Sequence, residues 1–193
     1  MNKQQQPIGV FDSGVGGTSI WKEIIQRLPN EHTVYLADSI NAPYGIKTKE
    51  EIVEICIQNT EYLIHKGAKI IVVACNTATT NAISILREKY DIPFIGIEPA
   101  IKPAALFSKT EAIGILATKG TLTSKLFVKT ANEYTKNITT IEQDGEGLVE
   151  LIEAGKLNSA ETQQLLTNYL APMLQFNIDQ LVLGCTHYPY LIP

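Results

Sequence analysis

Short apolar runs alternate along this chain with longer segments whose apolar positions recur every three or four residues. The short runs predict strands at residues 8–11, 34–37, 70–74, 93–97, 112–117, 138–141 and 181–184. The periodic segments predict helices at residues 18–28, 49–66, 147–154 and 160–175, with two more that end near residues 90 and 132. Regular alternation of strand and helix predicts an α/β fold, in which mainly parallel sheets are flanked by helices.

The alternation restarts after residues 98–103, a segment that contains Pro99 and Pro103 and predicts a hinge or linker. We therefore expect a first α/β domain at residues 1–98 and a second at residues 99–193. The two halves resemble each other, which hints at an internal repeat.

Two cysteines follow predicted strands in similar local sequences. The run Ile70–Ala74 leads into Cys75-Asn76-Thr77, and the run Leu181–Gly184 leads into Cys185-Thr186-His187. Parallel sheets bind ligands at the carboxyl ends of their strands, and Asp12 stands at a third such end. A matched pair of thiols suits the removal of a proton from one face of a carbon and its return to the other.

Each thiol alone has a plainer interpretation as an inert buried side chain, because free cysteine is among the most buried residue types. A metal site would need more ligands at closer spacing, and a redox pair would be favoured by a C-x-x-C motif, which is absent. Cys56 lies on the apolar stripe of a predicted helix, so we expect it to pack in the core. The pairing and the flanking polar residues favour a chemical role for the other two.

Three further segments could contact a ligand, each with a plainer alternative. Residues 12–17 form a glycine-rich turn whose N–H groups could bind an anion, or a tight turn in which Asp12 caps a helix. His187 could stabilise a thiolate or protonate a substrate group, or could be an ordinary loop side chain. Tyr44-Gly45 lies in a loop on the ligand side of the sheet, where an ordinary turn is the alternative.

Composition excludes several classes of protein. A net charge of −4 disfavours nucleic-acid binding, which needs a clustered basic face. No apolar run approaches the ~18 residues that span a bilayer, and residues 1–7 form a polar lead-in without a signal-peptide core. Three cysteines without framework spacing indicate reduced thiols in the cytoplasm. We expect His32 and His65 at the surface and Trp21 in the core.

Four segments together resemble the glutamate racemases of the cofactor-independent aspartate/glutamate racemase superfamily. They are FDSGVGG at 11–17, PYG at 43–45, VACNTA at 73–78 and LGCTHYP at 183–189. The resemblance runs from about Ile8 to the end of the chain. It implies a two-domain α/β fold with the active site in the cleft, and interconversion of L- and D-glutamate that supplies D-glutamate for peptidoglycan. It also implies that no cofactor or metal is needed.

The resemblance also assigns roles to residues. Cys75 would take the α-proton from D-glutamate with the assistance of Asp12, and Cys185 would take it from L-glutamate with the assistance of His187. Hydroxyl, amide and backbone groups would hold the substrate at Asp12, Ser13, Tyr44, Gly45, Asn76, Thr77, Thr186 and His187. A free thiol has a pKa of ~8.5, so neighbouring groups must tune the attacking thiolate.

The chain departs from the family pattern in two places. Residues 143–146 stand where family members usually carry a Cys-Pro segment, and Glu153 is the candidate for the family's acidic residue near the second thiol. Family chains also continue past the Cys-Thr-His-Tyr-Pro segment and return to the first domain, whereas this chain ends at Pro193.

Three interpretations follow. The first is a cytoplasmic glutamate racemase with a small-molecule substrate and, as in many family members, a homodimeric state. The second is an aspartate racemase or another racemase of the superfamily, which the shared thiols do not distinguish from the first. The third is a truncated, catalytically silent protein that binds a ligand or a partner. Neither nucleic acid nor a membrane is an expected partner.

Overall fold

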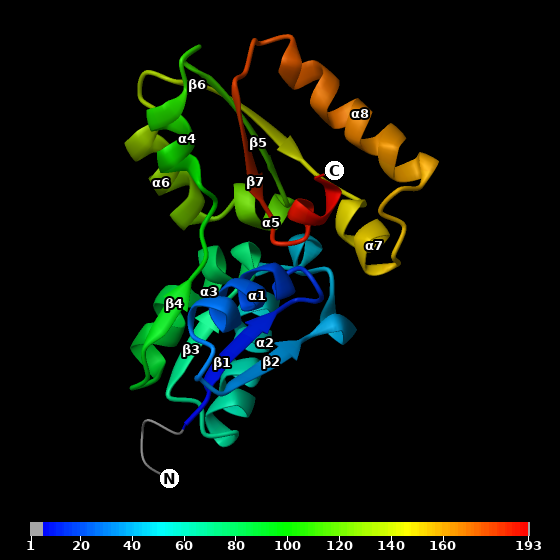
Figure 1. Ribbon diagram of the computed structural model, residues 1–193. Helices are drawn as coiled ribbons and strands as arrows, with labels where there is room; N and C mark the ends of the chain where they lie inside the picture. The colour runs from blue at the N-terminus through cyan, green and yellow to red at the C-terminus, as the bar shows by residue number, and fades with distance from the viewer. Residues whose placement is uncertain (1–5, 193) are drawn as a thin grey trace.

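The computed structural model describes residues 6–192 and contains two parallel sheets, each packed between helices (Figure 1). The first sheet has the order β2-β1-β3-β4 and is built from β1 (Ile8–Asp12), β2 (Thr33–Ala37), β3 (Ile70–Val73) and β4 (Phe94–Gly96). The second has the order β6-β5-β7 and is built from β5 (Ala112–Ala117), β6 (Thr139–Asp144) and β7 (Gln180–Gly184). All strand pairs in these sheets are parallel, so the predicted fold class is confirmed. We call the two sheets with their helices the first and second units.

The helices fall close to the predicted segments. They are α1 (Thr18–Arg27), α2 (Lys49–His65), α3 (Asn76–Lys89), α4 (Ile101–Phe107), α5 (Lys119–Leu122), α6 (Lys125–Tyr134), α7 (Leu148–Glu153) and α8 (Ala160–Leu174), with short 3₁₀ turns η2 (Ser39–Asn41), η3 (Tyr44–Ile46) and η4 (Tyr188–Leu191). None of the helices described within residues 6–192 is long and apolar enough to cross a membrane. Of the predicted lead-in at 1–7, residues 1–5 lie outside the described residues.

Two helical predictions need correction. The predicted hinge at 98–103 contains the start of α4, and Pro103 is the third residue of that helix. Proline is tolerated in a first helical turn because its missing N–H would have no intrahelical partner there. The single helix predicted to end near residue 132 is two helices, because Ser124 accepts a hydrogen bond from the N–H of Phe127 and starts α6 anew.

The two units share one topology. In each unit the first strand in sequence lies between the second and third, as β2-β1-β3 and as β6-β5-β7. The third strand, β3 or β7, leads within two residues to a cysteine, Cys75 or Cys185. The repeated local sequence seen around the two cysteines therefore reflects equivalent positions in two similar folds.

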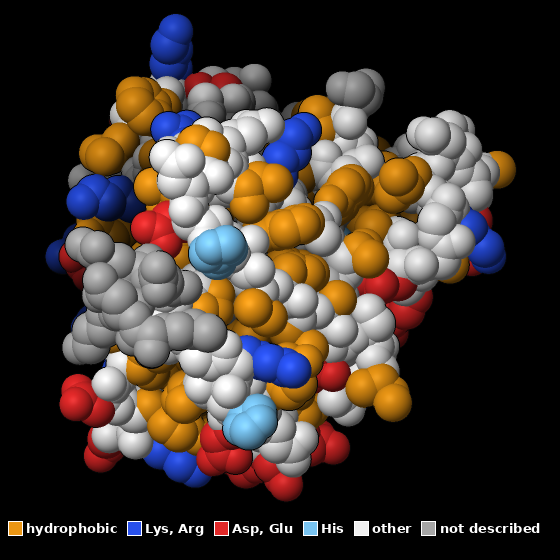
Figure 2. Space-filling view, turned by 60° about the horizontal axis from the view of Figure 1, so that its bottom comes forward, with side chains coloured by type: hydrophobic (Ala, Val, Ile, Leu, Met, Phe, Trp, Pro, Cys, Tyr) orange, Lys and Arg blue, Asp and Glu red, His pale blue; other side chains and the backbone are white. Residues whose placement is uncertain are grey.

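Each sheet buries both of its faces. Phe11 and Val73 face α2 and α3, whereas Val10 and Val72 face α1. In the second unit α4 and α6 cover one face and α7 and α8 the other. The cover provided by α1 is the thinner one, because no residue of this helix is fully buried and Trp21 is only half-buried against the Tyr35 ring. Figure 2 shows apolar side chains that remain on one face of the molecule.

The first turn of α2 offers a test of local stability. The hydroxyl of Thr48 accepts a hydrogen bond from the N–H of Glu51 at 3.3 Å, and the Glu51 carboxylate accepts one from the N–H of Thr48 at 2.7 Å. Replacing Thr48 by alanine removes this capping box, so we expect a loss of about 1 kcal/mol in the free energy of unfolding, measured by urea denaturation.

The matched control is Thr167→Ala in the middle of α8. The Thr167 hydroxyl bonds only to the carbonyl of Gln163, one turn earlier, so its removal should change stability little. Equal losses in the two variants would contradict a specific role for the α2 cap.

Candidate active site

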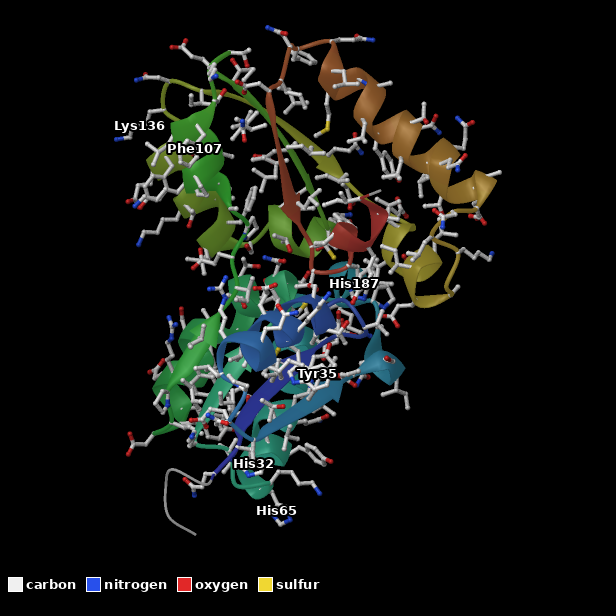
Figure 3. The ribbon with its side chains drawn as sticks, viewed as in Figure 1. His32, Tyr35, His65, Phe107, Lys136 and His187 are labelled. Atoms are coloured by element: carbon white, nitrogen blue, oxygen red, sulfur yellow. The ribbon has the colours of Figure 1, made fainter. Side chains whose placement is uncertain are left out.

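The carboxyl ends of three strands bring the predicted acid and both predicted thiols together. Asp12 is the last residue of β1, Cys75 follows β3 by two residues, and Cys185 follows β7 directly. Figure 3 shows His187 at the junction of the two units, whereas His32 and His65 lie at the far end of the first unit. Both of those histidines are exposed, as predicted.

Cys75 is held at the start of α3. It is 4% exposed, and its Sγ accepts a hydrogen bond from the N–H of Ala78 at 3.4 Å and lies 3.8 Å from Ser13 Oγ. Burial raises the pKa of the Cys75 thiol to about 12, and the nearby charge of Asp12 adds to the rise. The Ala78 N–H and the Ser13 hydroxyl oppose it by stabilising the thiolate.

Cys185 has a similar environment in the second unit. It is 7% exposed, and its Sγ lies 3.7 Å from Nδ1 of His187. Burial raises the pKa of the Cys185 thiol well above its usual value, whereas the backbone N–H of His187 lowers it. Cys75 and Asp12 also raise the pKa of Cys185 through their charges, so all three groups interact electrostatically.

Asp12 joins the two units. Its carboxylate is fully buried and accepts hydrogen bonds from the N–H of Gly14 at 3.0 Å and from the hydroxyl of Thr186 at 2.9 Å. Burial raises the pKa of Asp12, and the His187 imidazole, the Gly14 N–H and the Thr186 hydroxyl oppose this shift. Within the glycine-rich turn at 12–17, the N–H of Gly14 thus binds the carboxylate of Asp12, the first residue of the same turn.

His187 is oriented by an acid. It is 1% exposed, and its Nε2 lies 2.6 Å from Oε1 of Glu153 at the end of α7. The same oxygen accepts a hydrogen bond from the N–H of Val15 at 2.7 Å, which belongs to the first unit. Sequence alone could name Glu153 only through the family resemblance. In the structure the His187 ring contacts Glu153 through Nε2 and approaches the sulfur of Cys185 through Nδ1, so it links the acid to the second thiol.

A triangle of hydroxyls extends the site beyond the predicted residues. Thr77 Oγ1 lies 2.8 Å from Thr118 Oγ1 and 3.1 Å from Thr121 Oγ1, and the last two are 3.1 Å apart. Sequence analysis missed Thr118 and Thr121. Thr118 follows β5 directly, at the strand end that matches Asp12 in the first unit, and this position was the available signal.

The remaining predicted binding residues differ in whether their side chains lie beside the thiols and Asp12. The side chains of Ser13 and Thr186 do, as described above. The side chain of Asn76 instead donates from Nδ2 to the carbonyl of Ile97 at 3.1 Å. The Tyr44 hydroxyl is directed into the first unit, where it donates to Asp38 at 2.5 Å. Gly45, next to it, faces the second unit.

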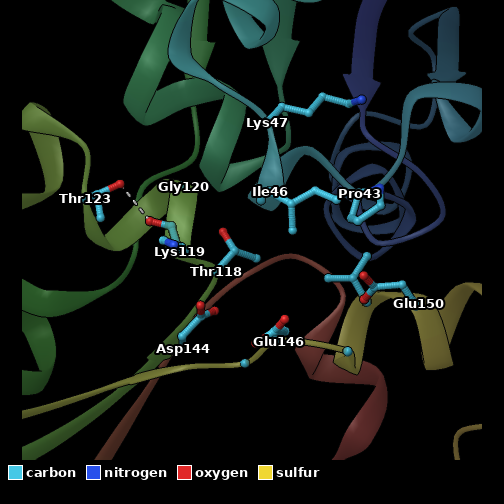
Figure 4. A pocket seen from close by; sticks show the side chains of 14 residues that line it. Pro43, Ile46, Lys47, Thr118, Lys119, Gly120, Thr123, Asp144, Glu146 and Glu150 are labelled. Carbon is cyan, nitrogen blue, oxygen red and sulfur yellow. Dashed lines mark hydrogen bonds between the residues drawn. The ribbon is translucent and has the colours of Figure 1, made fainter.

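A cavity of about 290 Å³ lies between the units beside this part of the site (Figure 4). Its lining residues are Pro43, Gly45, Ile46, Lys47, Thr118, Lys119, Gly120, Thr123, Asp144, Gly145, Glu146, Gly147, Val149 and Glu150. Thr118 lines the cavity and is also a member of the hydroxyl triangle, so the cavity adjoins the triangle, whereas neither Cys75 nor Cys185 is among its lining residues. Within residues 6–192, no group of three or more His, Cys, Asp or Glu side chains is arranged to hold a metal ion.

The buried thiols predict a specific loss of stability in alkali. A thiol with a raised pKa in the folded state keeps its proton there while the unfolded thiol loses it, so stability falls as pH rises above the unfolded pKa of ~8.5. The loss begins near the unfolded pKa of ~8.5 and grows by roughly 1.4 kcal/mol per pH unit, so the Cys75 thiol should contribute a loss of about 2 kcal/mol by pH 10.

Urea denaturation of the parent chain and of Cys75→Ser at several pH values tests this expectation. Serine does not titrate in this range, so the difference in unfolding free energy between the two proteins should shift in favour of the variant as pH rises. Parallel stability curves for the two proteins would show that the folded thiol titrates normally.

Comparison with known proteins agrees with this geometry. The Asp/Glu/Hydantoin racemase family matches residues 8–193. The glutamate racemase of Ectopseudomonas mendocina is 50% identical, over 100% of this chain and 74% of its own length, and that of Herpetosiphon aurantiacus is 46% identical, over 97% and 74%.

Solved structures show the same relation. Escherichia coli glutamate racemase, in complex with L-glutamate and the activator UDP-MurNAc-ala, superposes with a TM-score of 0.86 at 37% identity, over 96% of this chain and 71% of that one. The RacE1 isoform of glutamate racemase from Bacillus anthracis gives 0.85 at 35% identity, over 97% and 71%. The predicted resemblance is confirmed, and the chain belongs to the Asp/Glu/Hydantoin racemase family of isomerases.

Proposed function

We propose that this enzyme interconverts L- and D-glutamate with Cys75 and Cys185 as its two acid–base groups. The observation that carries the proposal is the placement of two thiols at equivalent strand ends, where both interact electrostatically with one buried carboxylate, Asp12. The names of the relatives support glutamate as the substrate, because the two curated relatives described above, at 50% and 46% identity, are glutamate racemases.

The reaction needs one deprotonated and one protonated thiol. With D-glutamate, the Cys75 thiolate takes the α-proton and becomes a thiol, and the Cys185 thiol gives its proton to the opposite face and becomes a thiolate. L-Glutamate then reverses both steps and returns the enzyme to its first state. Atoms and charge balance within one pair of turnovers, so the chemistry needs no cofactor.

The thiolate has to be formed in a site that disfavours it. Burial keeps both thiols protonated near neutral pH, because it raises both pKa values. A bound amino acid brings an α-ammonium group, whose positive charge would favour a thiolate beside it. The N–H groups of Ala78 and His187 already point at the two sulfurs and provide the remaining stabilisation.

The acids beside each thiol have separate tasks in this mechanism. Asp12 assists Cys75, and the Glu153–His187 pair assists Cys185 by holding the imidazole 3.7 Å from its sulfur. Because Asp12 binds Thr186 across the cleft, these groups take up their positions only when the two units are closed. Substrate would therefore enter when such contacts between the units open.

Polar groups around the thiols would bind the two carboxylates of glutamate. Ser13, Asn76 and Thr186 lie on the thiol side, and the Gly45 backbone with the hydroxyls of Thr77, Thr118 and Thr121 lies on the side of the cavity. In the cell the product D-glutamate would enter peptidoglycan, and the enzyme would act in the cytoplasm as a homodimer.

Substitution of single thiols tests the two-base mechanism. Cys75→Ser and Cys185→Ser should each lower racemisation by roughly 10²- to 10⁴-fold, because each removes one positioned acid–base group. NMR in D₂O, with L- and D-glutamate followed separately, would measure exchange of the α-proton and inversion together.

Cys56→Ser is the matched control, since Cys56 is equally buried but packs in the core of the first unit. It should retain inversion. Full activity in either active-site variant would contradict the two-thiol mechanism, and binding of glutamate without any exchange would favour a silent binding protein. Exchange with aspartate and not with glutamate would assign a different substrate.

The pH dependence of the reaction follows from the raised pKa of Cys75. In the free enzyme the base form grows with pH up to a pKa of about 12, so kcat/KM for D-glutamate should rise about tenfold per pH unit between pH 7 and pH 9. Initial rates at substrate concentrations far below KM would measure it. A profile that is flat from pH 6 upward would mean that the thiolate is already present in the free enzyme.

A further inference from the structure

A closed polar network lies behind the Tyr44–Gly45 turn, inside the first unit. Its centre is the Asp38 carboxylate, which is 6% exposed and directly follows β2. Asp38 accepts hydrogen bonds from the Tyr44 hydroxyl at 2.5 Å, from Nδ2 of Asn59 at 3.2 Å and from Nδ2 of Asn41 at 2.9 and 3.0 Å. Nδ2 of Asn59 also donates to the Tyr44 hydroxyl at 2.9 Å.

This network uses both functions of the Tyr44 hydroxyl. The hydroxyl gives its one proton to Asp38 and accepts from Asn59, while the side chain is 1% exposed. A phenol engaged in this way has no proton left for a substrate carboxylate. Tyr44 therefore influences the site by fixing the position of the residues next to it in the chain.

The neighbour that matters is Gly45. A Cβ atom at this position would lie 2.7 Å from Cβ of Thr118, and the Gly45 carbonyl oxygen lies 3.1 Å from where a Cβ of Gly120 would be. The backbone of the turn thus packs directly on the second unit, beside the hydroxyl triangle. Figure 4 shows the neighbouring side chains of this turn, Pro43 and Ile46, facing Thr118 across the cavity.

The network joins elements that would otherwise be independent. Asp38 comes from the end of β2, Tyr44 from η3, and Asn59 from the middle of α2. A buried carboxylate is costly unless several donors satisfy it, so the native arrangement favours one position of the turn over others. A shift of about 1 Å in such a turn is enough to misalign groups that bind a substrate.

We propose that Asp38 and Asn59 are positioning residues that act through Tyr44 to set the position of the Gly45 backbone against Thr118, and so complete the substrate site when the two units close. The inference rests on the proposed racemase function for its kinetic consequence. Its structural consequence, an ordered turn at residues 38–48, does not depend on that function.

The central experiment compares Tyr44→Phe with Tyr90→Phe. Tyr90 is the matched control, because its hydroxyl also donates to a carboxylate of the first unit, that of Glu61 at 2.8 Å, but away from the cleft. Tyr44→Phe should lower kcat/KM for glutamate by roughly 10- to 100-fold, whereas Tyr90→Phe should stay within about twofold of the parent. Asn59→Ala, which leaves the Tyr44–Asp38 bond in place, should have an intermediate effect.

A double variant shows whether the residues act along one path. Asp38→Asn keeps the size of the side chain but turns an NH₂ group toward the amide donors. Combined with Tyr44→Phe, it should lower kcat/KM little further than the stronger single variant does, because both break the same network.

Hydrogen exchange of backbone amides provides a readout that needs no turnover. Tyr44→Phe should speed exchange in peptides from residues 38–48, and Tyr90→Phe should not. If Tyr44→Phe fails to fold, Asn59→Ala takes its place and should likewise speed exchange in peptides from residues 38–48.

A folded Tyr44→Phe or Asn59→Ala with parental exchange in this segment would overturn the proposal, as would a lowered melting temperature with unchanged kcat/KM. A parent chain that does not racemise glutamate would refute the proposed function alone, and the exchange data would still decide whether the network orders the turn.

Discussion

The bond between Asp12 and Thr186 is the interaction on which the site depends. It joins the end of β1 in the first unit to the residue after Cys185 in the second, and both partners are buried. Neither Cys75 nor Cys185 would share an environment with the other if this contact were open. The Glu153 carboxylate supports the same closure, because it contacts His187 in the second unit and the Val15 N–H in the first.

Closure has an electrostatic cost that shapes the chemistry. The same burial that brings Asp12 and the thiols together raises the pKa of all three groups. Water is a poor competitor in such a site, so the N–H groups of Ala78 and His187 act strongly on the sulfurs, as a substrate's ammonium group would in the proposed reaction. If the thiolate forms mainly when substrate is bound, the protonated thiols of the free enzyme would resist oxidation, because the thiolate is the reactive form.

Repetition of one topology accounts for the matched pair of thiols on which the proposed mechanism depends. β3 and β7 occupy equivalent places in their sheets, so Cys75 and Cys185 approach the cleft from two similar units. The surroundings are not equivalent, because Ser13 contacts the first sulfur and His187 the second. The shared topology supplies the pair, and the differing loops supply the separate partners that the proposed mechanism assigns to each thiol.

Sequence by itself determined the alternation of strands and helices, the parallel sheets and the placement of Asp12, Cys75 and Cys185 at strand ends. These features are local: apolar periodicity sets each element, and the direction of a parallel strand decides which residue leaves the sheet at its ligand-binding edge. The family resemblance added roles for these residues, which the structure leaves as proposals.

Only the tertiary structure decided which distant groups meet. Thr118 and Thr121 join Thr77, Glu153 reaches His187, and the Tyr44 hydroxyl turns toward Asp38 and Asn59. No periodicity encodes these contacts, because each links elements from different parts of the chain. Their physical cause is the need of buried polar groups for partners, which can be satisfied only once the elements that carry them have packed together.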